Sequence, residues 1–115
     1  MKRAMISTCG GACPVQRSLE VIEGKWTLLI LRELLGGTKR FGELRRAIDD
    51  VNPKTLTDRL RTLEQHAILQ RELFPEIPPR VEYTLTEKGR ALAPVLQALA
   101  IWGTQWTRAE KAAAR

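Results

Sequence analysis

Two β-type runs, ILQREL and RVEYTLT, flank the segment FPEIPP and leave few folds open to this chain. The second run alternates Val81, Tyr83 and Leu85 with polar residues, which is the period of a strand with one buried face. Three prolines within five residues cannot continue a hydrogen-bonded ladder. We therefore expect a single two-stranded ribbon with a stiff, protruding tip.

The segments before the ribbon are patterned for helices. A short amphipathic segment begins at Pro14 and is stopped by Gly24. The next segment, KWTLLILRELLGG, is apolar nearly all round and ends in two glycines, which is typical of a central buried helix. A third segment, RFGELRRAID, places Phe41, Leu44 and Ile48 on one side. A short turn then leads into a fourth segment.

That fourth segment, NPKTLTDRLRTLEQH, has only a narrow apolar stripe. Asn52 is a good N-cap and Pro53 a good first residue. The stripe consists of residues at helical spacing, Leu56, Leu60, Leu63 and Ala67. The remaining surface can form hydrogen bonds throughout, through Lys54, Thr55, Thr57, Asp58, Arg59, Arg61, Thr62 and Gln65.

After the ribbon, a longer helical pattern runs from Thr86 to about Arg108. Pro94 within it predicts a kink or a late start of the regular helix. Its apolar face is wider than one small domain needs. The segment therefore has apolar surface left over after packing on its own chain.

The chain is basic, with 19 Lys and Arg against 13 Asp and Glu, a net charge of +6 and a pI near 9.9. This balance suits a polyanionic partner or an acidic membrane surface. No apolar run approaches the ~20 residues that cross a bilayer, and the start lacks the hydrophobic core of a signal peptide. We expect a cytoplasmic protein with one domain over residues 13–108 and flexible segments at 1–12 and 109–115.

The order helix, helix, helix, turn, helix, ribbon, helix is that of a winged helix-turn-helix, a mainly α fold with a small β-ribbon (α+β). Its reader helix docks by one apolar stripe and keeps a free face for base edges and phosphates. Residues 53–66 fit this role, and the candidate DNA contacts are Lys54, Thr55, Thr57, Asp58, Arg59 and Arg61. The alternative is an ordinary solvated face with helix pairs such as Asp58 and Arg61, and the helix alone does not decide between the two.

The ribbon favours the DNA interpretation. Arg71 and Arg80 near a rigid tip suit a wing that follows the DNA backbone or enters the minor groove. Further candidates for phosphate contacts surround the third helical segment, namely Lys39, Arg40, Arg45 and Arg46. Taken singly, each of these four residues is more often an ordinary surface charge that only keeps the protein soluble.

Four segments, CPVQRSLEVIEGKWTLLILREL, FGELRRAI, LTDRLRTLE and PPRVEYTLTEKG, each resemble the HxlR-type transcriptional regulators, small bacterial winged-helix proteins related to the MarR group. The resemblance covers roughly Cys13 to Trp102. The chain departs from the pattern at Glu23, where many relatives have glycine, and at Asn52, where serine is usual. Both residues suit their local roles, since Asn caps a helix as well as Ser does.

The resemblance implies a homodimer on a pseudo-palindromic operator in double-stranded DNA. The N- and C-terminal helices would then be dimerisation helices, and the late VLQALAIWG accounts for the surplus apolar face. The interface residues implied are Val15, Leu19, Leu96, Leu99, Trp102 and Trp106.

Cys13 stands immediately before Pro14, and the resemblance implies a redox or electrophile sensor there, because some HxlR-type regulators sense such compounds through an N-terminal cysteine. A thiol at the start of a helix lies near the positive dipole end, which favours the thiolate. The alternative is a small buried hydrophobe near the dimer interface. Cys9 is either a resolving partner or incidental, and a reducing compartment disfavours a structural disulfide. The effector stays open between an oxidant, an electrophile, another small molecule and none.

We expect no metal and no cofactor, because Cys9, Cys13 and His66 fall short of structural zinc spacing. His66 is expected at a helix C-terminus. We also expect no enzyme, since the sequence has no glycine-rich phosphate loop, no paired carboxylates on recognisable elements and no nucleophile with a histidine at motif spacing. The rival to a DNA-binding regulator is a winged-helix module for protein–protein interaction that binds DNA only non-specifically.

Overall fold

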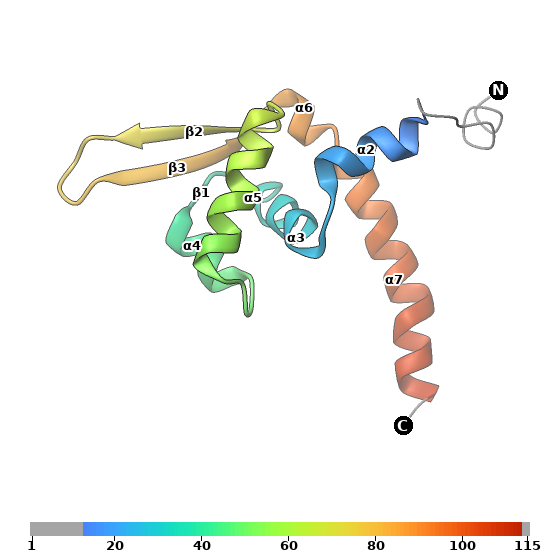
Figure 1. The fold of residues 1–115 in the computed structure, drawn as a ribbon. Helices are drawn as coiled ribbons and strands as arrows, with labels where there is room; N and C mark the ends of the chain where they lie inside the picture. The colour runs from blue at the N-terminus through green and yellow to red at the C-terminus, as the bar shows by residue number, and fades with distance from the viewer. Residues whose placement is uncertain (1–12, 114–115) are drawn as a thin grey trace.

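The computed structural model describes residues 13–113, with side chains to residue 107. Figure 1 shows helices grouped at the foot of a long hairpin, with one further helix leaving this body. In chain order the elements are α2 (Pro14–Ile22), α3 (Lys25–Leu34), β1 (Lys39–Arg40), α4 (Phe41–Ala47), α5 (Pro53–Gln65), β2 (Leu69–Phe74), β3 (Arg80–Leu85), α6 (Glu87–Arg90) and α7 (Ala93–Ala113). The predicted winged helix-turn-helix order, mainly α with a small β-ribbon, is confirmed.

The core lies where α3, α4 and α5 meet the foot of the ribbon. Ile30 and Leu31 of α3 are fully buried, as the apolar pattern of this segment predicts. Leu44 and Leu56 meet them from α4 and α5. Burying these side chains holds α5 in place, at roughly 1.5–3 kcal/mol for each fully buried aliphatic side chain.

The sheet has one strand more than the sequence predicts. The ribbon of β2 and β3 is antiparallel and pairs Leu69 with Leu85 at its foot. The short β1 adds to the other edge of β3, in the order β1-β3-β2, with Lys39 opposite Tyr83. A hydrogen bond of 2.8 Å between the hydroxyls of Thr38 and Thr84 extends this pairing. Two residues are too short for an alternating pattern, so the sequence alone does not reveal β1.

The apolar stripe of α5 is confirmed at Leu56, Leu60 and Leu63, all buried. It is wrong at Ala67, which is exposed and lies beyond the end of α5 with a φ of 59°. The backbone N–H of Ile68 donates to the Leu63 carbonyl at 2.9 Å, and Ile68 is the next buried side chain. The helix therefore ends at Gln65, two residues before the last position of the predicted stripe.

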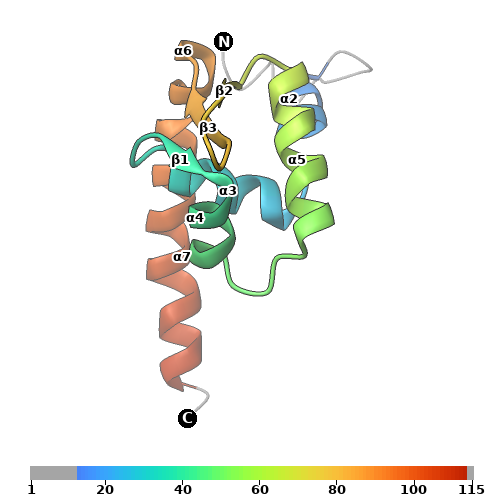
Figure 2. The ribbon, with the colours of Figure 1, turned by 90° about the vertical axis from the view of Figure 1, so that its left-hand side faces the viewer.

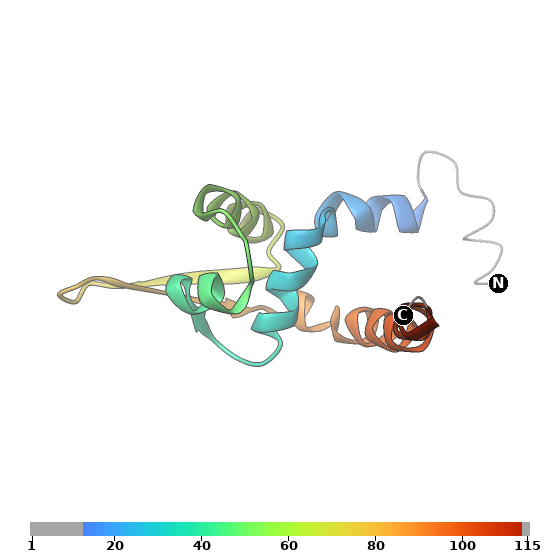
Figure 3. The same cartoon turned by 90° about the horizontal axis from the view of Figure 1, so that it is seen from below.

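The C-terminal pattern divides into α6 and α7, so the late start predicted from Pro94 is confirmed. Pro94 is the second residue of α7, where its missing N–H costs no helical hydrogen bond. The regular helix then continues to Ala113, further than the pattern up to Arg108 predicts. Seen along its axis from below, α7 lies beside the body and apart from the ribbon (Figure 3). Within residues 13–113, no helix is both long and apolar enough to span a bilayer.

A tight joint connects α6 to the loop that ends α5. A Cβ atom on Gly89 would lie 2.2 Å from the Ile68 carbonyl oxygen, so only glycine allows this approach. The Thr86 hydroxyl donates to the Ala67 carbonyl at 2.6 Å and accepts from the Gly89 N–H at 3.1 Å. Lys88 Nζ donates to the His66 carbonyl at 2.8 Å. These contacts fix α6, which leads into α7, to the end of α5.

Candidate nucleic-acid interface

The first turn of α5 is fixed by the predicted cap. Asn52 Oδ1 accepts from the backbone N–H of Lys54 at 2.7 Å and of Thr55 at 3.4 Å. Pro53 occupies the first helical position, where no N–H is needed. The cap holds the start of α5 in a defined direction, and a helix start is where a reader helix contacts bases.

The outer face of α5 is open and its charges are unpaired. Lys54, Thr57, Asp58 and Arg61 are exposed. Within residues 13–107, none of these four side chains forms a hydrogen bond or an ion pair. The pair between Asp58 and Arg61, which an ordinary solvated face would be expected to form, is absent from this part of the chain. Figure 2 shows α5 lying along one side of the body with no element covering it. We call these four residues the open face.

Two residues grouped with the open face by sequence lie elsewhere. Arg59 is partly buried, and its guanidinium packs beside Gly24, 3.6 Å from where a Cβ atom would stand. Gly24 has a φ of 91°, which marks the sharp turn between α2 and α3. Thr55 is also partly buried. No periodicity argument reveals the Arg59 contact, because it depends on a turn distant in sequence.

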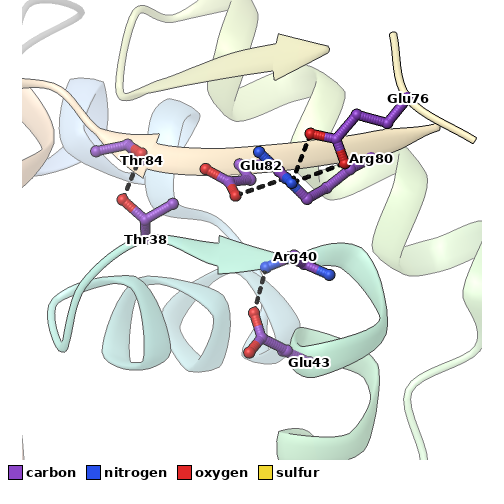
Figure 4. Close-up of polar contacts among 7 residues, drawn as sticks. All are labelled: Thr38, Arg40, Glu43, Glu76, Arg80, Glu82 and Thr84. Atoms are coloured by element: carbon purple, nitrogen blue, oxygen red, sulfur yellow. Dashed lines mark hydrogen bonds and ion pairs between the residues drawn. The ribbon is translucent and has the colours of Figure 1, made fainter. Parts of the chain in front are cut away.

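The tip of the ribbon holds the charge of Arg80 in internal ion pairs (Figure 4). Arg80 Nη1 lies 2.8 Å from Glu76 Oε2, and Arg80 Nε lies 2.9 Å from Glu82 Oε2. The guanidinium also stacks 4.0 Å from the centre of the Phe74 ring. The Arg80 side chain is only 24% exposed. Arg80 therefore stabilises the bend of the ribbon, and a contact with DNA would require it to leave both carboxylates.

The basic residues around α4 point to solvent with one exception. Arg40, Arg45 and Arg46 are exposed, whereas Lys39 is partly buried. Glu43 Oε1 accepts from the Arg40 backbone N–H at 2.7 Å, which caps α4 and leaves the Arg40 guanidinium out of this bond (Figure 4). The structure thus gathers three of the four arginines and lysines predicted here as an accessible basic edge.

A cleft of 280 Å³ separates α5 from the ribbon. We call it the α5–ribbon cleft, and its lining residues are Thr57, Leu60, Arg61, Glu64, Arg71 and Tyr83. Arg71 Nε lies 3.4 Å from Glu64 Oε1 and so links β2 to α5. Burial raises the pKa of Tyr83, the charge of Glu64 adds to this, and the charges of Arg71 and Arg61 oppose it. The phenol is therefore neutral, and a hydrogen-bond donor, at neutral pH.

The predicted dimer residues are mostly uncovered. Val15 and Leu19 of α2 are about half exposed, as are Leu99, Trp102 and Trp106 of α7. Leu96 differs, because it is partly buried and packs against the core of its own chain. A small protein rarely leaves so many large apolar side chains in water unless a partner covers them.

Cys13 is disulfide-bonded in the structure, whereas the sequence disfavours a structural disulfide. The expectation rested on the redox state of the cellular compartment, which the fold of the chain does not record. Cys9 lies outside the described residues. The described part also holds no group of three His, Cys, Asp or Glu side chains that could bind a metal ion. His66 caps the C-terminus of α5, as its place in the sequence predicts.

Comparison with known proteins gives consistent matches. A family model described as HxlR-like helix-turn-helix matches residues 21–111. An uncharacterised HTH-type transcriptional regulator of Synechocystis sp. is 48% identical over 101 residues, covering 88% of this chain and 75% of that protein. A putative MarR-family regulator from Porphyromonas gingivalis W83 superposes with a TM-score of 0.82 at 38% identity, covering 85% of this chain and 96% of that one. The redox regulator HypR in its reduced form gives 0.80 at 38% identity, covering 86% and 98%.

Proposed function

The chain belongs to the HxlR family of helix-turn-helix transcriptional regulators, and from that premise we propose that it binds a pseudo-palindromic operator as a homodimer with α5 in the major groove. The basic surface attracts the duplex, and the first turns of α5 read base edges. In such a dimer the two reader helices lie about 34 Å apart, one turn of B-DNA. We place this dimer in the cytoplasm, together with the DNA that it binds.

The unpaired open face of α5 carries this proposal. Charged residues on a solvated helix gain from pairing with neighbours three or four positions away. Lys54 and Asp58 stand four positions apart and form no such pair. Lys54 can donate to guanine O6 or N7, and Asp58 can accept from the cytosine amino group. Thr57 can donate to a phosphate or contact a thymine methyl. Arg61, one turn further along, lies beside the ribbon.

The exposed apolar surface of α2 and α7 supports the homodimer. Leu99, Trp102 and Trp106 recur at three- and four-residue spacing, so they share one side of α7. A second copy could bury this side against its own. The variant Trp102→Glu is expected to give a monomer by size-exclusion chromatography with light scattering, with an unchanged circular dichroism spectrum. A dimer that survives this change would place the interface elsewhere.

Cys13 is proposed as the redox-responsive residue of the regulator. Its disulfide in this structure, together with the similarity to a redox regulator, supports this role. The test compares the operator affinity of the wild type and of Cys13→Ser, with and without a thiol oxidant. The wild type should change its affinity on oxidation and the variant should not. Equal sensitivity of both proteins would remove Cys13 from the mechanism.

The main experiment measures binding to DNA directly. The reduced protein is titrated by fluorescence anisotropy into the DNA upstream of its own gene and into a scrambled duplex, at two salt concentrations. Tight binding to the upstream DNA alone, weakening as salt rises, is the expected result. Equal and weak binding to both duplexes would mean either that the operator lies elsewhere or that the rival function, a winged-helix module that binds a protein partner, is correct. A genome-wide selection of bound DNA fragments separates these two cases.

A further inference from the structure

The α5–ribbon cleft brings together side chains from three elements. Thr57, Arg61 and Glu64 face it from α5, where spacings of four and three residues put them on one edge of the helix. Arg71 of β2 and Tyr83 of β3 face it from the ribbon. The end of α5 and the foot of β2 lie side by side in Figures 1 and 2, so the cleft opens next to the helix that we place in the major groove.

The cleft is rich in hydrogen-bond donors that have no partner. Arg61 forms no hydrogen bond or ion pair within the described part of the chain. Arg71 uses only its Nε atom, toward Glu64, and both of its Nη groups stay available. Tyr83 is 9% exposed, and its hydroxyl has no hydrogen-bond partner among residues 13–107. The hydroxyl oxygen is not itself a fully buried atom, so it reaches the space of the cleft and can donate to a ligand there.

The single carboxylate in the cleft positions an arginine. Glu64 holds Arg71, which lines the cleft, through Nε and leaves its Nη groups unused. Two guanidinium groups against one carboxylate leave the cleft positively charged. A group with several oxygen acceptors and a negative charge matches this set of donors, and planar guanidinium groups suit phosphate geometry in particular.

We propose that the α5–ribbon cleft binds one phosphate group between Arg61 and Arg71, with the hydroxyls of Thr57 and Tyr83 as further donors. This inference rests on the proposed DNA-binding function, because the DNA backbone is the source of phosphate next to α5. Arg61 is then a backbone contact, although the sequence groups it with the base readers. Free inorganic phosphate is the second source of the same chemistry.

The first test replaces single phosphates of the operator by neutral methylphosphonates. The wild type should lose about tenfold in affinity at one phosphate in each half-site, the size expected for a charged hydrogen bond. Arg61→Gln and Arg71→Gln should each bind natural DNA about tenfold more weakly and lose their sensitivity at this same phosphate. Lys54→Ala should keep that sensitivity, since it lies outside the cleft. Arg32→Gln, which removes an exposed charge from α3, controls for a general loss of positive charge.

A second variant protects the test against misfolding. Tyr83→Phe removes only a hydroxyl that has no partner, so the thermal unfolding midpoint should not fall. Affinity for natural DNA should fall several-fold, whereas affinity for DNA with the critical methylphosphonate should be the same as for the wild type. Unchanged affinity for natural DNA would remove Tyr83 from the site.

The other arm adds inorganic phosphate to the complex with operator, against sodium chloride at matched ionic strength. Stronger competition by phosphate with the wild type, but not with Arg61→Gln or Arg71→Gln, would show that the cleft also accepts the free anion. Equal competition, with the methylphosphonate result intact, would leave DNA as its only source.

The two levels of the proposal can fail separately. If Arg61→Gln and Arg71→Gln abolish sensitivity at different phosphates, or if Arg61→Gln relaxes base specificity, the cleft does not bind one phosphate while DNA binding by α5 stands. If neither Lys54→Ala nor any cleft variant changes binding to DNA, the proposed function itself is overturned.

Discussion

The open face of α5 and the tip of the ribbon both carry charged side chains, yet they use them in opposite ways. On α5, Lys54, Asp58 and Arg61 have no ion-pair partner within the described residues. At the ribbon tip, Arg80 is held by Glu76 and Glu82. The ribbon as a whole has two arginines against three glutamates over residues 69–85. A basic residue therefore attracts DNA only where no neighbouring carboxylate neutralises its charge. The net charge of the chain does not tell which basic residues these are.

The open face and the ribbon therefore have different roles in this winged helix. The open face offers donors and acceptors that a duplex can satisfy, whereas the ion pairs of the ribbon are used to hold its shape. Surface ion pairs contribute little stability singly, typically about 0–1 kcal/mol, but a pair of carboxylates on one guanidinium fixes its direction. We therefore expect substitutions in the two regions to act on different measurements.

The largest effect should come from the buried side of α5. Leu60→Ala is expected to lower the free energy of unfolding by about 2–5 kcal/mol, because it removes a fully packed side chain and leaves a cavity. Urea denaturation followed by circular dichroism measures this. The neighbouring Thr57→Ala should change the stability by less than about 0.5 kcal/mol. A similar loss in both variants would mean that the two sides of α5 are not independent.

On the open face the loss should appear in binding instead. Asp58→Ala is expected to weaken operator binding by about 1–3 kcal/mol and to relax selectivity at one base pair, with the unfolding midpoint unchanged. Anisotropy titrations with single-base variants of the operator test this. Gln65→Ala, at the far end of α5, serves as the control. Uniform weakening across all operator variants would assign Asp58 no role in reading bases.

The N-cap of α5 stabilises the helix that carries both the buried stripe and the open face. Asn52→Ala should lower the free energy of unfolding by about 1 kcal/mol, since two backbone N–H groups lose their acceptor. Asn52→Ser keeps an acceptor and should retain most of this stability. Thermal unfolding of both variants gives the answer. Equal stability of the two would show that the cap contributes nothing.

The smallest effect on DNA binding is expected at the ribbon tip. Arg80→Gln should leave the salt dependence of operator binding unchanged, because this guanidinium is already neutralised. Arg46→Gln should reduce the slope of log affinity against log salt by about 1, as the loss of one phosphate contact does. Affinities at four salt concentrations distinguish the two. A reduced slope for Arg80→Gln would mean that Arg80 leaves its carboxylates to contact DNA.

Local features of the fold follow from the sequence, because they depend on neighbouring residues. The Asn52 cap, the stripe of Leu56, Leu60 and Leu63, and the delayed start of α7 at Pro94 all arise from spacing and backbone chemistry. The resemblance to HxlR-type regulators supplies the family, which the comparisons confirm.

Features that depend on distant contacts do not follow in the same way. The pairing of β1 with β3 needs only two residues, so it leaves no pattern. Arg59 and Arg80 look like free basic residues until the Gly24 turn and the carboxylates of the ribbon are placed beside them. The end of α5 before Ala67 is likewise set by where Ile68 packs. In each case the partner lies outside the window in which periodicity can be detected.

The joint at Gly89 has a mechanical consequence. The segment that leads into α7, with its exposed tryptophans, begins beside the end of α5, and the contacts of Thr86, Lys88 and Gly89 leave little freedom between the two helices. Because this joint is tight, we expect α5 and α7 to rotate together as one rigid unit. In the proposed homodimer, the angle at which the two copies of α7 pack would then set the direction of each α5. We expect a signal that changes this packing angle by a few degrees to change the spacing between the two α5 helices on the DNA.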